Sequence, residues 1–305
     1  MKTNAARVID PILSGIVQGY SNASFIYTEL APHVMTPTRG GTVLKFGKEH
    51  FQVGGLNRAP GADAKRFNFG YSGEKYSTIE HTLEATVERA ASQEADAVPG
   101  INMATEAVNA VMDIIQNDTE YNVANVLRDA SNYATSHKVA LTGSDKWSDP
   151  SSKIIAQVRA AKEVIRATTG KEPNVLAVSA KVWVSMQDHP DFVGRVSNNV
   201  TRLVTPELVA AVLGLAKVVI GGALHIDAKG NFVDTWGTDA ILAFVTPNAA
   251  MRTPNFAYTY LLEGNPLVEA PYYENSARSW IYGVTKEYAP VIAGNDAGFL
   301  FKNAV

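Results

Sequence analysis

Apolar and polar positions alternate most regularly over residues 76–87. One face of the alternation carries Ile79, His81, Leu83, Ala85 and Val87, and threonines and glutamates occupy the other face. A period of two over this length predicts a strand with one buried face. His81 is expected to be a hydrogen-bonded core residue rather than a metal ligand, because no second ligand is suitably spaced.

Helical periodicity is strongest in residues 101–134. Apolar residues recur there at three- and four-residue steps, at Ile101, Ala104, Val108, Val111 and Ile115. The pattern follows Pro99-Gly100 and predicts one helix of about 34 residues, about 50 Å long. Such a helix is much longer than the usual ~11 residues.

Residues 139–250 have the alternating helices and strands of an α/β domain. We expect helices at 151–168, 180–187 and 208–215, and strands at 174–179, 217–220 and 240–245. Thr205 is a helix N-cap followed by Pro206 at the first helical position. A turn is expected at 227–231.

From residue 255 the pattern returns to strands, at 256–262, 267–273 and 279–284. None of these strands completes a parallel β-α-β unit, and they would more naturally pair with the strand at 76–87. The α/β segment is then an insertion in a second domain, which holds the sheet and the long helix.

The first 75 residues lack such regularity. Proline and glycine interrupt residues 1–38, at Pro11, Gly15, Gly19, Pro32 and Pro37. We expect an irregular arm there, with its apolar side chains against its own body or a neighbour. Glycines also punctuate residues 40–75, where short strand-like pieces flank a turn at 57–63, so we expect a long hairpin.

This hairpin segment is basic within a slightly acidic chain. Lys45, Lys48, Arg58, Lys65, Arg66 and Lys75 stand against Glu49, Asp63 and Glu74. Two strands of ~15 residues would reach ~50 Å, and an isolated two-stranded hairpin is marginally stable in water. A neighbouring subunit is the simplest cover, so we expect intersubunit contacts at Arg58, Lys65, Arg66, Phe67 and Phe69. The alternative for the three charged residues is a solvated loop face.

Composition narrows the function classes. The formal net charge of -3 is too near neutral for a protein that grips nucleic acid through its phosphates. The chain has no cysteine, which excludes disulfides and thiolate chemistry. No apolar run has the length of a membrane span or the form of a signal peptide.

Candidate chemistry is sparse. The chain lacks the Gly-x-x-x-x-Gly-Lys-Ser/Thr, Gly-x-Gly-x-x-Gly, Gly-x-Ser-x-Gly and His-Glu-x-x-His motifs. Glu80 and Glu84 are more simply a solvated strand face than paired carboxylates. Tyr272-Tyr273-Glu274 is more simply a packing cluster than a binding site, and the four tryptophans are core or interface anchors. We expect no catalytic residue, cofactor or metal site, and no enzyme activity.

Several stretches resemble the coat proteins of some siphophages. They are Arg58-Ala59-Pro60-Gly61-Ala62 with Lys65-Arg66, Val98-Pro99-Gly100-Ile101, Asp234-Thr235-Trp236-Gly237, and Tyr272-Tyr273 with Ser279-Trp280-Ile281-Tyr282. The order of parts over nearly the whole chain is similar to that of tailed-phage major capsid proteins with the Hong Kong 97-type fold. The resemblance implies an α+β chain with an N-terminal arm (1–38), an extended loop (39–75), a peripheral domain with a spine helix (76–138 and 251–305) and an inserted axial domain (139–250).

The resemblance also implies a function and partners. Copies of the chain would form hexamers and pentamers of an icosahedral virion shell, assembled in the host bacterial cytoplasm around double-stranded DNA that is not read by sequence. The arm begins close to Met1, so a separate scaffold protein is expected, together with a portal and, as an option, decoration proteins. No membrane contact is expected.

Two alternatives remain open. An encapsulin-type shell would share the fold and enclose cargo protein. A soluble α/β enzyme would use residues 150–250, but it needs polar groups gathered at strand carboxyl ends, and the sequence shows none.

Overall fold

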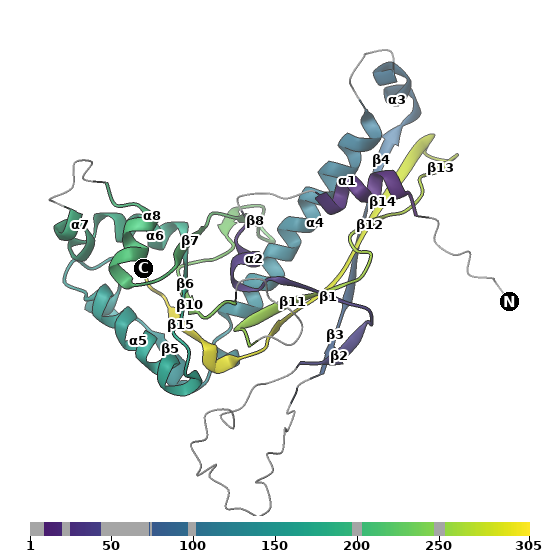
Figure 1. Cartoon of the computed structure of the whole chain (residues 1–305). Helices are drawn as coiled ribbons and strands as arrows, with labels where there is room; N and C mark the ends of the chain where they lie inside the picture. The colour runs from purple at the N-terminus through teal and green to yellow at the C-terminus, as the bar shows by residue number, and fades with distance from the viewer. Residues whose placement is uncertain are drawn as a thin grey trace, which may run out of the picture.

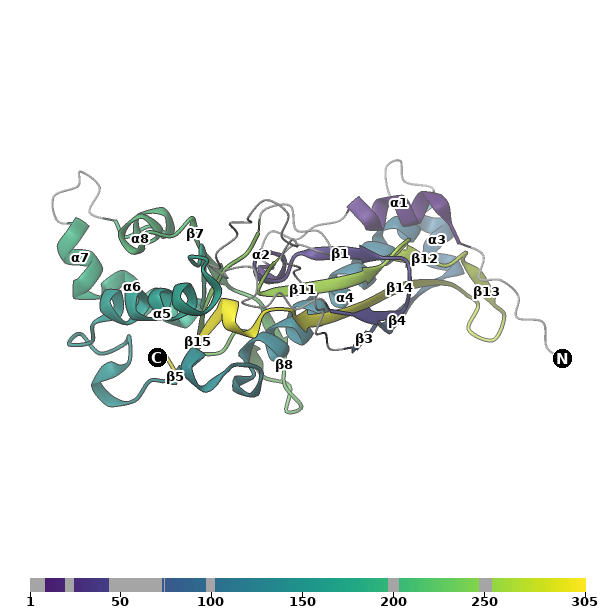
Figure 2. The ribbon, with the colours of Figure 1, turned by 60° about the horizontal axis from the view of Figure 1, so that its bottom comes forward.

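Two β-sheets joined by one long helix organise the chain (Figure 1). The computed structural model describes residues 9–19, 25–43, 73, 75–96, 102–196, 203–246 and 254–305. In Figure 2 the two sheet regions lie at opposite ends of an elongated molecule, with the long helix running between them.

The larger sheet is built around one strand, β14 (Ser279–Ile292). On one side β14 pairs with β4 (Ile79–Glu88) in an antiparallel ladder. On its other side three strands follow one another along its length: β11 (Ala257–Leu262), β12 (Leu267–Val268) and β13 (Tyr272–Glu274). The predicted pairing with the strand at 76–87 is confirmed for β14. The single strand expected at 267–273 is wrong, because that segment holds two short strands instead.

The long helix is α4 (Met103–Arg128), which packs on β4 and β14. Its N-cap is Asn102, whose side chain accepts a hydrogen bond from Thr105 N at 3.1 Å. The sequence predicts a helix to residue 134, and the structure ends it six residues earlier. Asp129 is extended there, and its side chain accepts from Ser131 N at 2.8 Å. Short polar side chains often hydrogen-bond to nearby backbone amides in this way, and such a bond competes with the helical backbone hydrogen bonds.

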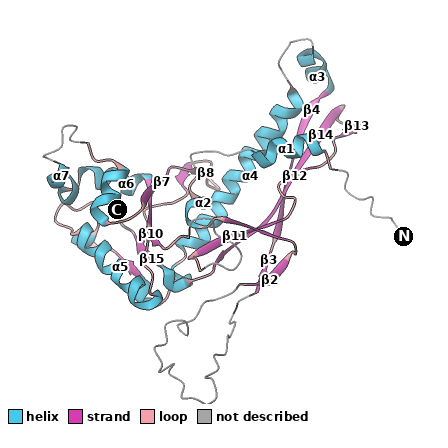
Figure 3. Cartoon of the chain, in the orientation of Figure 1, coloured by secondary structure: helices cyan, strands magenta, loops and turns pink. Residues whose placement is uncertain are grey.

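The second sheet has the strand order β5-β15-β10-β6-β7. Its members are β5 (Lys138–Ala140), β6 (Val175–Ser179), β7 (Lys217–Gly221), β10 (Ala240–Ala243) and β15 (Gly298–Lys302). Four helices accompany it: α5 (Ile154–Thr169), α6 (Ala180–Asp188), α7 (Pro190–Val196) and α8 (Pro206–Leu213). Figure 3 shows these helices gathered around the sheet. The predicted helices and strands of this region are present with small shifts at their ends, and Thr205 caps α8 as expected.

Strand β15 corrects the expected division of the chain. Residues 251–305 were expected to belong with the larger sheet, yet β15 lies between β5 and β10 in the smaller one. Phe299, Leu300 and Phe301 of β15 are all buried in the smaller sheet, and this burial of apolar side chains stabilises β15 in that position. The chain therefore returns to the α/β unit at its end, and this unit is not a simple insertion.

The N-terminal arm also differs from expectation. It contains α1 (Pro11–Gly19), α2 (Tyr27–Leu30) and β1 (His33–Thr36), where the sequence predicts no regular element. Pro11 is compatible with the first turn of a helix, and the Asp10 carboxylate accepts from Ile12 N and Leu13 N at 2.9 and 3.0 Å. Strand β1 pairs in parallel with β11. The described part of the arm thus lies on its own subunit.

Two small strand pairs and one short helix lie outside these two sheets and their helices. Strands β2 (Gly40–Thr42) and β3 (Lys75–Ser77) pair antiparallel at the two ends of the expected hairpin. Helix α3 (Arg89–Asp96) follows β4. Strands β8 (Leu224–Ile226) and β9 (Phe232–Asp234) form a hairpin around the turn expected at 227–231. No helix in the described ranges is long and apolar enough to cross a bilayer.

Candidate assembly surface and interdomain junction

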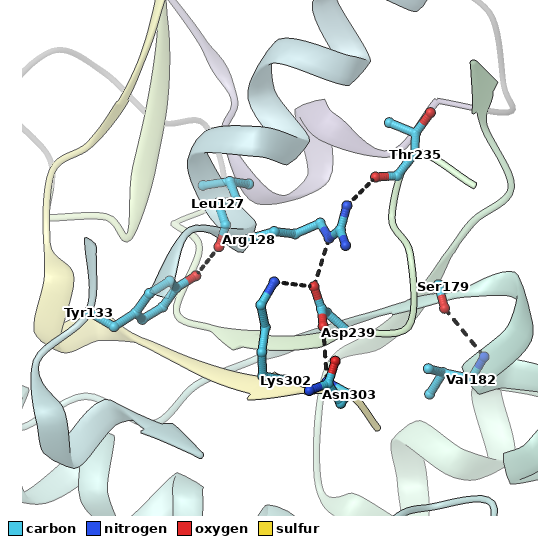
Figure 4. Close-up of polar contacts among 9 residues, drawn as sticks. All are labelled: Leu127, Arg128, Tyr133, Ser179, Val182, Thr235, Asp239, Lys302 and Asn303. Carbon is cyan, nitrogen blue, oxygen red and sulfur yellow. Dashed lines mark hydrogen bonds and ion pairs between the residues drawn. The ribbon is translucent and has the colours of Figure 1, made fainter. Parts of the chain in front are cut away.

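A buried carboxylate joins α4 to the α/β unit (Figure 4). Arg128, the last residue of α4, donates from Nε to Asp239 Oδ2 at 2.8 Å. Lys302 of β15 donates to the same oxygen at 2.8 Å, and Asn303 N donates to Asp239 Oδ1 at 3.1 Å. Only 2% of the Asp239 side chain is exposed. Burial disfavours the charged form of a carboxylate, and here two cations and a hydrogen bond from one backbone amide offset that cost.

The segment Asp234–Gly237 makes the rest of this junction. Arg128 Nη1 donates to Thr235 O at 2.8 Å, and Asp234 pairs with Lys181 of α6 at 2.7 Å. Gly237 has φ +57, and a Cβ there would collide with the Arg128 guanidinium. Glycine is thus required both by the left-handed backbone and by the close approach of the arginine.

Trp236 ties the same segment to the middle of α4. Its Nε1 donates to Glu120 Oε1 at 2.6 Å, and Glu120 also accepts from Ile26 N and Tyr27 N of the N-terminal arm. Burial raises the pKa of Glu120, while these three donors oppose the rise. One fully buried side chain therefore holds together the arm, the long helix and the α/β unit. Asp234–Gly237 is one of the stretches that resemble siphophage coat proteins, but the sequence alone predicts no role for it.

On β4, the side that points away from α4 is exposed and acidic, whereas Thr285 and Glu287 of β14 on the same side are buried. Thr82 and Thr285 hydrogen-bond across β4 and β14 on this face at 2.9 Å. Glu80, Glu84 and Glu88 alternate with threonines on β4 and are all exposed. Residues four apart on a strand are ~13 Å apart, so Glu80 and Glu84 are too distant to act as paired carboxylates. We call Glu80, Glu84 and Glu88 the acidic stripe.

The opposite face of β4 is less covered than the sequence predicts. Val87 is buried, but Ile79 is 64% exposed and Leu83 is 37% exposed. His81 lies between these two positions. Its Nδ1 is 3.0 Å from Asp118 Oδ2, and its ring stacks on Tyr288 at 4.5 Å. His81 is thus hydrogen-bonded as predicted, but on a half-covered face. Within the described residues, no group of three or more His, Asp or Glu side chains is arranged to hold a metal ion.

Aromatic residues mark the far end of this sheet. Trp280 of β14 is 37% exposed and meets the ring of Tyr273 edge-on at 5.3 Å. Tyr272 on the same hairpin is half exposed, whereas Trp147, Trp183 and Trp236 are buried. Three tryptophans are therefore core residues, and Trp280 is the exposed one.

The residues predicted to contact a neighbour lie outside the described residues. These are Arg58, Lys65, Arg66, Phe67 and Phe69. The structure places only the two ends of their segment, at β2 and β3 beside β14. The network of Arg128, Asp239 and Lys302 was missed, because its members are more than sixty residues apart and no local pattern links them.

Comparison with known proteins gives a consistent result. No protein-family model matches the chain. The major capsid protein of Burkholderia phage BcepMu is 29% identical over 300 residues, 96% of both chains, and that of Pseudomonas phage JBD67 is 24% identical over 256 residues, 78% of this chain and 77% of the other.

Solved structures extend this similarity. A phage-related protein from Bordetella bronchiseptica RB50 is 38% identical, with a TM-score of 0.85 over 98% of both chains. The mature capsid of bacteriophage PhiM1 has a TM-score of 0.54 at 14% identity, over 93% of this chain and 88% of the other. The SrpI encapsulin of Synechococcus elongatus has a TM-score of 0.55 at 11% identity, over 97% and 89%. The last two show a shared fold alone.

Proposed function

The chain belongs to the phage major capsid proteins with the Hong Kong 97-type fold, and from this premise we propose that copies of it close into a shell by laying the basic segment 44–72 of one subunit on the acidic stripe of the next. The protein is a structural component of a virion capsid. The observation that carries the proposal is the row of exposed carboxylates on the edge strand β4, in a chain whose segment 44–72 is basic.

Charge supports this pairing. Residues 44–72 contain Lys45, Lys48, Arg58, Lys65 and Arg66 against Glu49 and Asp63. The acidic stripe offers exposed carboxylates at Glu80, Glu84 and Glu88. An arginine fork suits a carboxylate partner, so Arg58 is assigned to one carboxylate of the stripe, and Lys65 and Arg66 to others. Phe67 and Phe69 would add apolar area to the same contact.

The remaining parts of the proposal follow from the family. Hexamers and pentamers would tile an icosahedral shell that encloses double-stranded DNA without reading its sequence, assembled in the bacterial cytoplasm with scaffold and portal proteins and with decoration proteins as an option. An encapsulin shares the fold, but both curated relatives that match the sequence are phage capsid proteins. Nuclease-protected DNA inside purified particles supports the phage assignment, and cargo protein in its place contradicts it.

A charge-reversal experiment tests the contact. We expect Arg58→Glu, and Lys65→Glu with Arg66→Glu, to give folded subunits that melt normally but form few closed particles. Breaking an interfacial charge pair costs ~2–5 kcal/mol when it is partly buried, against ~0–1 kcal/mol when it is solvated. Particle yield is measured by sedimentation and electron microscopy, and subunit stability by thermal melting.

Rescue identifies the partner. Glu84→Lys in the Arg58→Glu background should restore particles if the two residues meet, while Glu84→Lys alone should reduce their yield. Lys153→Glu is the matched control, because Lys153 is an exposed lysine of the α/β unit. Normal particle yield from all charge reversals in segment 44–72 contradicts the proposal. A collapsed melting temperature would show that the segment holds its own subunit together instead.

Salt gives an independent check. Contacts between exposed charges are screened beyond a Debye length of ~8 Å at physiological ionic strength. Assembly followed by light scattering should therefore slow as salt rises, with unchanged circular dichroism of the subunits. An assembly rate that does not respond to salt would count against an electrostatic contact.

A further inference from the structure

A cavity of about 420 Å³ lies between the N-terminal arm, α4 and the turn after β11. Figure 2 shows α2, β1, β11 and α4 side by side in this region. Its wall is apolar at Met35, Met112 and Leu261, and polar at His33, Lys286, Gln18, Gln116 and Asn265. Small-molecule sites commonly have this volume and combine apolar surface with convergent polar groups.

Lys286 supplies the charge of the cavity. The residue is 2% exposed, and its Nζ donates to Thr119 Oγ1 at 3.0 Å. The rings of Tyr27 and Tyr288 lie 5.6 and 5.3 Å from Nζ. An ammonium can donate three hydrogen bonds. Among the described residues, Lys286 donates one, to Thr119.

The nearest carboxylates are engaged elsewhere. Asp118 is held by His81 and by Tyr288, and Glu120 accepts from two backbone amides and Trp236. Residues 20–24, which follow α1 in the chain, contain no Asp or Glu. Burial therefore lowers the pKa of Lys286 to about 8, and Asp118 only partly opposes this shift. Within the described residues no carboxylate forms an ion pair with Lys286, and a buried cation in that position is costly, so this residue is a candidate for function.

His33 adds a second unsatisfied group in the same wall. Its Nε2 is buried and has no hydrogen-bond partner within the described residues. Burial, and then the charge of Lys286, lower the pKa of His33 to about 4, so the ring is neutral near pH 7. In one neutral tautomer Nε2 is a donor. The cavity thus holds a cation and a neutral donor with spare hydrogen-bonding capacity.

We propose that this cavity binds a small organic carboxylate, with Lys286 as its cationic partner, His33 Nε2 as a second donor, and its apolar portion against Met35 and Met112. The inference does not depend on the proposed function. A charge-assisted hydrogen bond from an ammonium to a carboxylate is about twice as strong as a neutral one. The bound anion would join the arm to β14 through Lys286.

Binding should depend on pH through Lys286. The titratable groups that face it are Tyr27 from α2, His33 from β1, Asp118 and Glu120 from α4, His81 from β4 and Tyr288 from β14. Carboxylate binding needs the protonated lysine, so affinity should fall as pH rises above about 8. By linkage, the bound carboxylate in turn raises the pKa of Lys286.

The test is a thermal-shift and calorimetric titration of the purified protein with sodium acetate, butyrate and hexanoate near pH 7. The matched alcohols and sodium chloride at equal ionic strength are the ligand controls. We expect the melting temperature to rise with chain length for the carboxylates and to stay unchanged with the alcohols. Lys286→Met should weaken binding at least ~10-fold, the loss of a charge-assisted contact of ~1.4 kcal/mol or more, and His33→Phe should weaken it less.

Lys153→Met is the control variant, since it removes one positive charge from an exposed position, and it should bind as the wild type does. Equal shifts in the Lys286→Met variant, or no shift with any carboxylate, overturn the proposal. The proposal is also overturned if particle assembly requires Lys286 but does not respond to free carboxylates. That result would show that a side chain of a neighbouring copy occupies the cavity.

Discussion

The two sheets of this protein differ in how completely each is covered by its own chain. In the smaller sheet every residue of β6 and β10 is buried. One face packs on α5, α6 and α8, and the other packs on α2 and the end of α4. In the larger sheet, β4 buries a single residue, Val87, and its second face carries the exposed acidic stripe.

This difference indicates which region has a complete core and which leaves surface exposed. A sheet covered on both faces is a complete three-layer core. A sheet with a long exposed edge strand leaves backbone and side-chain surface for other molecules. In a shell protein the first region sets the shape of the subunit, and the second offers surface for assembly.

The largest expected effect comes from the covered region. Trp147 is fully buried, packs on Phe301 and donates from Nε1 to Gln157 Oε1 at 2.7 Å. Trp147→Ala should destabilise the subunit by ~3–5 kcal/mol, because it opens a large cavity and leaves a partly buried acceptor without its donor. Urea unfolding of the subunit measures this. A loss below ~1 kcal/mol would mean that the α/β core is not the stable part of the molecule.

The junction between the two regions should respond next. Asp239→Asn keeps the shape but removes the charge that Arg128 and Lys302 share. Both cations are partly exposed, so we expect the free energy of unfolding to fall by ~2–3 kcal/mol, which is less than the full cost of breaking a buried pair. Asp234→Asn is the control, since its partner Lys181 is mostly exposed, and it should cost ~0–1 kcal/mol. Equal losses from both variants would contradict the assignment of Asp239 as the junction residue.

Lys286→Met should stabilise the ligand-free subunit near pH 7 by ~1–2 kcal/mol, because it replaces a buried charge with an apolar chain. The pKa of Lys286 is lowered to about 8 in the folded state, so the wild type gains stability as pH rises from about 8 to the unfolded value near 10.5. The advantage of the variant should therefore shrink over that window. Chemical denaturation at a series of pH values measures it, and a constant difference across the series would show that the charge is not responsible.

The smallest expected effect on the subunit comes from Trp280. Its side chain is 37% exposed at the far end of the larger sheet, so Trp280→Ala should change subunit stability by at most ~1 kcal/mol. Particle yield should fall more than subunit stability does, since exposed aromatics are common anchors at interfaces. The paired measurement is urea unfolding of the subunit with sedimentation of assembled particles. A stability loss as large as that of Trp147→Ala would remove the contrast between the two sheets.

The elements with strong local signals were the ones that sequence reasoning found. The N-cap at Thr205, the alternation on β4 and the periodicity of α4 each depend on neighbouring residues, and each element is present. The arm was misjudged because Pro11 and Gly15 suggest a break, whereas the burial of Leu13 and Val17 against α4 stabilises a helix there. Such packing is a tertiary effect that overrides local propensity.

By itself the sequence determined the order of helices and strands, the lack of chemical motifs and the separation of a basic segment from acidic strands. It did so because these properties depend on residues close together in the chain. Only the tertiary structure decided that β15 joins the α/β sheet, that Asp239 meets Arg128 and Lys302, and that Lys286 and His33 face one cavity. Those contacts join residues tens to hundreds of positions apart, and their energies arise from burial and charge that exist only once the layers have packed.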